Sequence, residues 1–147
     1  MAIVCSWTGD GFIYLALTAF VLLAGGLGAL VQIVAAAVNI GLLHCMYPII
    51  KNWTARPRPY RLHPDLPPLS RPLDEYSFPS GHAMTLTAAL VPIAMSSSAS
   101  LFPALVLWGV MSWARLASAH HYPSDILGGT AMALLVSYPI SHFLLML

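Results

Sequence analysis

Residues 11–50 read GFIYLALTAFVLLAGGLGALVQIVAAAVNIGLLHCMYPII and contain no Asp, Glu, Lys or Arg. Since roughly 20 apolar residues cross the hydrocarbon core of a bilayer as a helix, this stretch is long enough for two membrane-spanning helices. The run Gly25-Gly26-Leu27-Gly28 interrupts it near its middle, and glycines tolerate the backbone angles of a tight turn. We therefore expect a helical hairpin, with helices over about residues 8–25 and 28–50.

Two further stretches, residues 76–114 and 126–147, also lack charged residues. A serine-rich run breaks the first into two helices, whereas the second accommodates one. The sequence thus predicts an all-α fold, a polytopic transmembrane bundle of about five helices in one domain over residues 1–147. The last three helices are expected over about 81–97, 101–118 and 126–146. A cleaved signal peptide is the alternative for the first helix, but no basic segment precedes it and no small-residue cleavage site is clear.

The composition agrees with a membrane protein and excludes other classes. Hydrophobic residues make up 59% and charged residues 7% of the chain, against about 45–50% and about 25% in soluble domains. A mean hydropathy of +0.78 is the reverse of a disordered sequence. The pI of about 7.9 indicates no general attraction to nucleic acid. Cys5 and Cys45 lie in different apolar stretches, without the spacing of a disulfide framework or a zinc site.

Five spans place every charged residue at one end of the bundle. Asp10 precedes the first helix, residues 51–75 connect the second to the third, and Arg115 and Asp125 flank the turn between the fourth and fifth. The C-terminus then lies at the opposite, uncharged end. The loop over 51–79 holds seven of the 12 prolines, so we expect an extended surface segment rather than a sixth helix. Such a gathering of charge fits a reaction centre, although basic cytoplasmic loops would also account for it.

Three basic residues at this end are candidates for binding a phosphoryl group. Lys51 and Arg58 follow the second helix, and Arg115 lies near the end of the fourth. Guanidinium groups bind phosphate oxygens bidentately, and a transferring phosphoryl group spreads its charge over three oxygens. The alternative for Lys51 and Arg58 is that they extend to lipid headgroups at a helix end. We assign only that second role to Arg56 and Arg61.

Ser80 and Gly81 lie where the third helix is expected to begin. The free N–H groups and the positive end of the dipole at such a position favour a bound anion, and a glycine lets the main chain approach closely. Alternatively, Ser80 only caps the helix. Both roles are compatible.

His121 and Asp125 form the sharpest candidate pair. Pro123 favours a helix start near it, which puts His121 in the loop and Asp125 in the first turn. The carboxylate can then accept one ring N–H and leave the other nitrogen as a nucleophile. An interfacial histidine with Asp125 as a helix cap is the alternative, and the adjacent His120 is a second candidate nucleophile. His82 is the candidate general acid, because imidazole titrates near neutrality.

No HExxH or cysteine spacing supports zinc at these histidines, so we expect no metal and no other cofactor. Phosphate binding explains the arginines better.

Three motifs follow one another in this chain: K-x6-R-P at Lys51–Pro59, P-S-G-H at Pro79–His82, and R-x5-H-x3-D at Arg115–Asp125. In this order, with a helical hairpin between the second and third, the chain resembles the type-2 phosphatidic acid phosphatase superfamily, the membrane lipid phosphate phosphatases related to vanadium haloperoxidases. The resemblance covers residues 28 to about 140, within a motif-bearing core over 28–146. It favours His121 over His120, because only His121 has the motif's spacing to Asp125.

The resemblance implies metal-independent hydrolysis of a lipid phosphomonoester or polyprenyl diphosphate through a phosphohistidine intermediate. His121 would attack phosphorus, Asp125 would orient it, and His82 would protonate the departing oxygen and then activate water. The residues implied to hold the phosphoryl oxygens are Lys51, Arg58, Ser80, Gly81 and Arg115. The chain departs from the family at Ala114, where serine is frequent, and in having about five spans instead of six.

Two other functions stay open from the sequence. The same intermediate would permit phosphoryl transfer between lipids, and a catalytically silent membrane protein could bind anionic lipids. The expected partners are a lipid phosphate and the bilayer, with no nucleic acid and no oligomeric state indicated. The resemblance places the protein in the bacterial inner membrane with its active site on the periplasmic face, whereas the positive-inside rule would place all six Lys and Arg residues in the cytoplasm.

Overall fold

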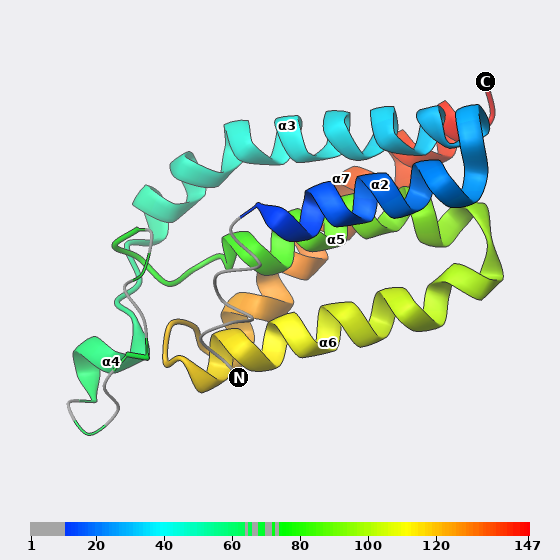
Figure 1. Ribbon diagram of the computed structural model, residues 1–147. Coiled ribbons are helices and arrows are strands. Elements are labelled where there is room, and N and C mark those ends of the chain that lie inside the picture. The colour runs from blue at the N-terminus through cyan, green and yellow to red at the C-terminus, as the bar shows by residue number, and fades with distance from the viewer. Residues whose placement is uncertain (1–10, 64, 66–67, 70–71, 73) are drawn as a thin grey trace.

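The computed structural model describes residues 11–63, 65, 68–69, 72 and 74–147. It is all-helical in this part of the chain, and five long helices run along one another (Figure 1). They are α2 (Phe12–Gly25), α3 (Leu30–Thr54), α5 (Gly81–Ser96), α6 (Leu101–Ala117) and α7 (Pro123–Leu145). Three short helices join them: η1 (Gly26–Ala29), α4 (Pro59–Leu62) and η2 (Ser98–Ser100). The predicted all-α bundle is confirmed.

Two helix limits differ from the predicted spans by three or four residues, the end of α3 and the start of α7. Residues 8–10 of the first predicted span lie outside the described residues. Helix α3 passes the first charged residue, Lys51, and ends when Ala55 adopts a left-handed backbone with φ 43°. Helix α7 begins at Pro123 rather than at 126, because proline is well suited to the first helical position.

The prolines predict an extended loop after α3, but the loop contains one helical turn. Arg58 has extended backbone angles, and the fixed φ of Pro59 then starts the single turn of α4. The expectation of a wholly extended segment is therefore wrong at residues 59–62.

Three helical segments are long and apolar enough to cross a membrane by length and composition. They are Phe12–Leu62, which contains α2 and α3, Ser98–Ala117 and Pro123–Leu145. Helix α5 is a shorter apolar helix of 16 residues.

Helix α5 lies at the centre of the bundle and packs against α3, α6 and α7. Its small and apolar side chains fill the contacts: Met84 and Ala88 meet Leu43 of α3 and Ala133 of α7. Hydrogen bonds also join α3, α5 and α7. The Asn39 side chain of α3 donates to Ser141 Oγ of α7 at 2.9 Å and to the Ala88 carbonyl of α5 at 3.3 Å. The outward faces carry large exposed apolar side chains, including Phe20, Leu23 and Leu135.

The two ends of the bundle are formed by different helix ends and connections (Figure 1). One end brings together the C-terminal ends of α3 and α6, the N-terminal ends of α5 and α7, and the loop with α4. The opposite end holds the turns between α2 and α3 and between α5 and α6, together with the C-terminus. All charged residues that the structure describes lie toward the first end. The predicted separation of charge therefore holds for the described residues.

Candidate active site

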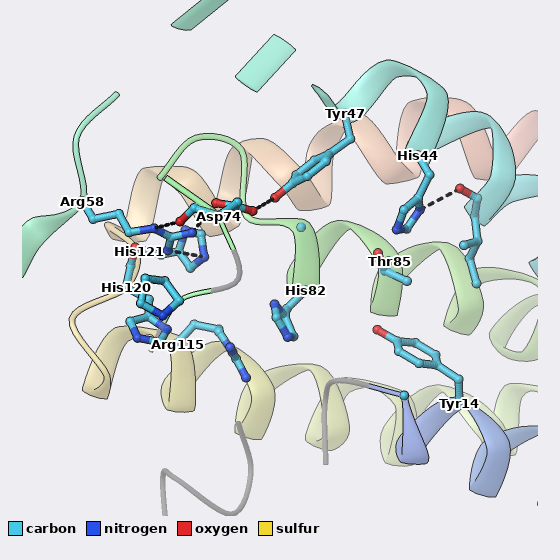
Figure 2. A pocket seen from close by; sticks show the side chains of 14 residues that line it. Tyr14, His44, Tyr47, Arg58, Asp74, His82, Thr85, Arg115, His120 and His121 are labelled. Carbon is cyan, nitrogen blue, oxygen red and sulfur yellow. Dashed lines mark hydrogen bonds and ion pairs between the residues drawn. The ribbon is translucent and has the colours of Figure 1, made fainter. Parts of the chain in front are cut away.

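A cavity of about 570 Å³ opens among the helices at the charged end. Figure 2 shows Arg58, Asp74, Arg115, His120 and His121 gathered on one side of it. His82 lies in the middle, and further polar side chains lie beyond it; these are Tyr14, His44 and Thr85. The lining residues come from α2, α3, α5, α6 and the two loops at this end.

Asp74 is the centre of an ion-pair cluster at the cavity wall. Its carboxylate lies 2.7 Å from Lys51 Nζ and 2.5 Å from Arg58 Nη2. Tyr47, one helical turn before Lys51 on α3, donates its hydroxyl hydrogen to Asp74 Oδ2 at 2.6 Å and also contacts Lys51 Nζ. Burial alone would raise the pKa of Asp74, but the hydrogen bonds from Lys51 and Tyr47 outweigh it and hold the pKa below its ordinary value.

Arg58 connects this cluster to the predicted nucleophile. Its Nη1 donates to the carbonyl of His120 at 2.8 Å and lies 3.4 Å from His121 Nε2. Its Nε donates to the Asp74 carbonyl at 3.1 Å. With 3% of its surface exposed, the guanidinium is held rigidly at the cavity wall. Such a group can bind an anion next to the imidazole.

His121 is oriented by a main-chain group. Its Nδ1 lies 2.7 Å from the Ser77 carbonyl oxygen, and a carbonyl can only accept, so Nδ1 carries the proton and Nε2 keeps its lone pair. Asp125 Oδ2 is 3.7 Å from the same nitrogen. The predicted hydrogen bond from His121 to Asp125 is thus replaced by one to Ser77, and Asp125 supplies a nearby negative charge.

The electrostatic surroundings keep His121 neutral. The pKa of His121 is lowered to about 4, chiefly by burial and also by the charges of Arg58 and Lys51, while Asp125 acts in the opposite direction. At neutral pH the imidazole therefore presents an unprotonated Nε2 to the cavity.

Asp125 is fully buried and compensated by Arg56. Arg56 Nη1 donates to Asp125 Oδ1 at 2.6 Å and to Ser124 Oγ at 2.8 Å, and the guanidinium lies over the ring of Tyr122. The other oxygen, Oδ2, accepts the Tyr122 backbone N–H at 2.8 Å and so caps α7. The assignment of Arg56 to headgroup contact alone is therefore wrong, because a fully buried carboxylate requires a cation.

The residues at the start of α5 have different roles at the site. The Ser80 hydroxyl accepts from the Ala83 N–H, and its own N–H donates to the Asp125 carbonyl at 3.0 Å, so Ser80 caps the helix and joins it to α7. Gly81 and His82 line the cavity, and Ser80 does not. A Cβ on Gly81 would meet Tyr47 Oη at 2.9 Å, which explains the need for glycine there.

Arg115 and His120 line the cavity from the end of α6 and the following loop. Both are nearly fully buried. Lys51 lies behind Asp74 and is not part of the cavity surface. The predicted site residues are thus gathered at one place: Arg58, Gly81, His82, Arg115 and His121 at the surface, with Lys51, Ser80 and Asp125 supporting them. Among the described residues, no three His, Cys, Asp or Glu side chains are grouped to hold a metal ion.

Sequence reasoning missed several participants. Tyr47 could have been found, because it precedes Lys51 by four residues and so shares its helix face. Asp74 stands in an irregular loop without periodicity or motif spacing. Ser77 acts through its carbonyl, for which a sequence carries no signal.

Residues 13–147 match the PAP2 superfamily. A decaprenylphosphoryl-5-phosphoribose phosphatase of Mycolicibacterium smegmatis is 36% identical over 88 residues, which are 60% of this chain. The matched region spans 47%, about half, of that relative's length. In structure, the chain is similar to a transmembrane PAP2 type phosphatidylglycerolphosphate phosphatase from Bacillus subtilis, with a TM-score of 0.71 and 20% identity over 97% of this chain and 74% of that one.

The likeness in structure shows a shared fold, and with the apolar helices it indicates an integral membrane protein. The matched residues include all three motifs that carried the resemblance. The chain belongs to the PAP2 superfamily.

Proposed function

We propose that this protein hydrolyses the terminal phosphate of a membrane lipid without a metal ion, through a phosphohistidine on His121. The observation that carries the proposal is the placement of His121 Nε2, which is neutral, faces the cavity and lies 3.4 Å from Arg58 Nη1. Family membership and the names of both relatives, phosphatases of lipids with a phosphorylated headgroup, support the reaction class.

In the first step, the lone pair of His121 Nε2 attacks phosphorus and the bond from phosphorus to the lipid oxygen breaks. The Nδ1–H bond to Ser77 holds the ring in position, and the nearby carboxylate of Asp125 stabilises the positive charge that the imidazole acquires. Arg58 and Arg115 are placed to bind the phosphoryl oxygens, whose charge they match.

His82 is proposed to give its proton to the departing lipid oxygen. It lies between the arginines and the uncharged side chains of Tyr14 and Thr85, where a leaving group would extend away from the cations (Figure 2). In the second step a water molecule attacks phosphorus, His82 takes one of its protons, and the bond from phosphorus to nitrogen breaks. Phosphate leaves and both histidines return to their starting states.

We place the protein in the bacterial plasma membrane with this site on the outer face. Both relatives are bacterial. The positive-inside rule counts free flanking cations, and four of the six Lys and Arg residues are engaged at the site: Lys51 and Arg58 with Asp74, Arg56 with Asp125, and Arg115 in the cavity wall.

The test measures phosphate release by purified protein in detergent with EDTA. The substrates are phosphatidylglycerol phosphate, phosphatidic acid and a polyprenyl diphosphate. We expect release by the native protein and a loss of at least about 1,000-fold in His121→Ala. His120→Ala is the matched control. It removes an imidazole that is as buried as that of His121, but it leaves His121 Nε2 in place.

A phosphoenzyme that is labile to acid and stable to base, trapped from the native protein and absent from His121→Ala, is the second expected result. Equal release by the native protein and His121→Ala would disprove the assignment of the nucleophile. No release from any lipid by folded native protein would disprove the proposed activity.

A further inference from the structure

The carboxylate of Asp74 occupies the position where an anion would be expected. Lys51 Nζ lies 2.7 Å from it. Arg58 Nη2 lies 2.5 Å from it, and the Tyr47 hydroxyl donates to it at 2.6 Å (Figure 2). Two of these three donors belong to the K-x6-R-P motif. A phosphate oxygen would use the same donors in the same way.

The cations need such an anion when the site is empty. Lys51 and Arg58 keep only 4% and 3% of their surface exposed. A buried charge without a partner is strongly unfavourable, so the protein without substrate is stabilised by the internal carboxylate. Asp125 does not serve this purpose, since it is paired with Arg56.

The Asp74 carboxylate is also next to the reacting atom. One guanidinium joins the two, because Arg58 binds Asp74 through Nη2 and faces His121 Nε2 through Nη1. An anion placed for attack by His121 therefore has to share Arg58 with Asp74 or replace it there.

We propose that Asp74 is an internal competitor for the phosphate site and thereby makes the site selective for phosphomonoesters over the phosphodiester lipids of the bilayer. The proposal rests on the proposed function, because it concerns the substrate of the same site. Asp74 acts through Lys51 and Arg58, so it is a specificity-determining residue and not a catalytic one.

The selectivity follows from charge. A phosphodiester headgroup carries one negative charge, as the carboxylate does, so exchanging one for the other brings no electrostatic gain. A phosphomonoester carries about 1.5 to 2 negative charges at pH 7 and three terminal oxygens, and it can displace the carboxylate. Phosphodiesters greatly outnumber phosphomonoesters in a membrane. Without Asp74, Lys51 and Arg58 would therefore bind the phosphodiester headgroups of the bilayer lipids.

Glu75 provides a matched control. It is the next residue and carries the same charge, but it is exposed and pairs with Arg61 at 3.1 Å, outside the cavity. Glu75→Gln therefore tests the effect of losing one negative charge near the site. Asp74→Asn tests the loss of the internal competitor, and it keeps the size of the side chain and an acceptor for the Tyr47 hydroxyl.

The first experiment measures binding of orthophosphate to purified protein by calorimetry, without turnover. We expect Asp74→Asn to bind phosphate about tenfold or more tightly than the native protein, the factor that one charge-assisted hydrogen bond provides. Glu75→Gln should bind as the native protein does. Phosphate should also raise the Tm of Asp74→Asn more than that of the native protein, because it restores the missing anion.

The second experiment measures phosphate release in mixed micelles with an increasing share of phosphatidylglycerol, a phosphodiester. The native protein and Glu75→Gln should keep their activity, whereas Asp74→Asn should be inhibited. If Asp74→Asn does not fold, Asp74→Ser is used, which also removes the charge.

Unchanged or weaker phosphate binding in the folded Asp74 variants would overturn the proposal, and so would equal inhibition by phosphatidylglycerol in all proteins. Failure of the proposed function is recognised separately. In that case the native protein releases no phosphate from any lipid, while the phosphate-binding comparison still decides the role of Asp74.

Discussion

At the scale of single residues, two Arg-Pro dipeptides stand two positions apart and have different tasks. Arg58 reaches the cavity and contacts His121, while Arg56 neutralises the buried Asp125. We predict that Arg58→Lys lowers kcat/KM about 100-fold, because the rigid fork is lost while the charge remains. Arg56→Lys should retain activity within about tenfold. It should lower the free energy of unfolding by about 1 kcal/mol, a modest value because Arg56 is partly exposed.

Kinetics and thermal unfolding of the two variants check this assignment. A larger loss of kcat/KM in Arg56→Lys than in Arg58→Lys would show that the first dipeptide, and not the second, serves the phosphoryl group.

The ionisation of His121 gives a prediction that needs no substrate. Burial holds its pKa at about 4, whereas an unfolded histidine titrates near 6.5. The ring should therefore remain neutral, with its proton on Nδ1, from pH 7 down to about pH 4. Because the unfolded state takes up the proton first, this residue reduces stability progressively as the pH falls from about 6.5 to 4.

Nitrogen NMR of histidine-labelled protein measures both quantities, and His121→Gln identifies the signal. A midpoint between pH 6 and 7 would contradict the lowered pKa that we attribute to burial. A proton on Nε2 in place of Nδ1 would contradict the hydrogen bond to the Ser77 carbonyl.

The limits of sequence reasoning are clearest at single side chains. Arg58, His82, Arg115 and His121 were predictable because motif spacing and their place at helix ends set them toward one membrane face. Asp74 was not, because a loop position has no periodicity from which its neighbours follow. The hydrogen-bond acceptor of His121 was predicted as Asp125 instead of the Ser77 carbonyl for a related reason. A carbonyl of any residue can accept a hydrogen bond, so the side chain of Ser77 gave no indication.

At the scale of helices, close backbone contact between α5 and α7 holds the site together. A Cβ on Gly129 of α7 would lie 2.7 Å from the Ser80 carbonyl oxygen, and neither backbone can move without shifting the start of α5. We predict that Gly129→Ala lowers both Tm and activity. Gly109→Ala in α6 is the control, since its Cβ would meet nothing within 4 Å and alanine favours a helix by about 1 kcal/mol.

Thermal unfolding and phosphate release distinguish the two substitutions. Equal effects at both positions would mean that helix propensity, and not the contact between α5 and α7, determines the result.

The number of helices was predictable because charge is absent from three long stretches, and a bilayer sets the length of helix that each must form. Their ends were less predictable. The sequence predicts the end of a span just before Lys51, but the Lys51 side chain contacts Asp74 and α3 continues to Thr54. A charged residue ends a membrane-spanning helix only where it must reach water, and here the half-buried carboxylate of Asp74 replaces the water.

For the whole molecule, the arrangement of the ends makes sidedness testable. The cavity lies at the charged end and the C-terminus at the other, so whichever side of the membrane holds the active site, the C-terminus lies on the opposite side (Figure 1). A simple count of cations would put the charged end in the cytoplasm. Four of those cations are engaged at the site, however, and Arg61 pairs with Glu75.

We therefore predict a cytoplasmic C-terminus. A green fluorescent protein fused after Leu147 should fluoresce in bacterial cells, and an alkaline phosphatase fused there should be inactive, because it folds only outside the cytoplasm. Phosphate release from the membrane of each strain confirms that the fused protein is intact. An active alkaline phosphatase fusion with a dark fluorescent one would place the cavity in the cytoplasm. The positive-inside rule would then hold even for cations that the site itself engages.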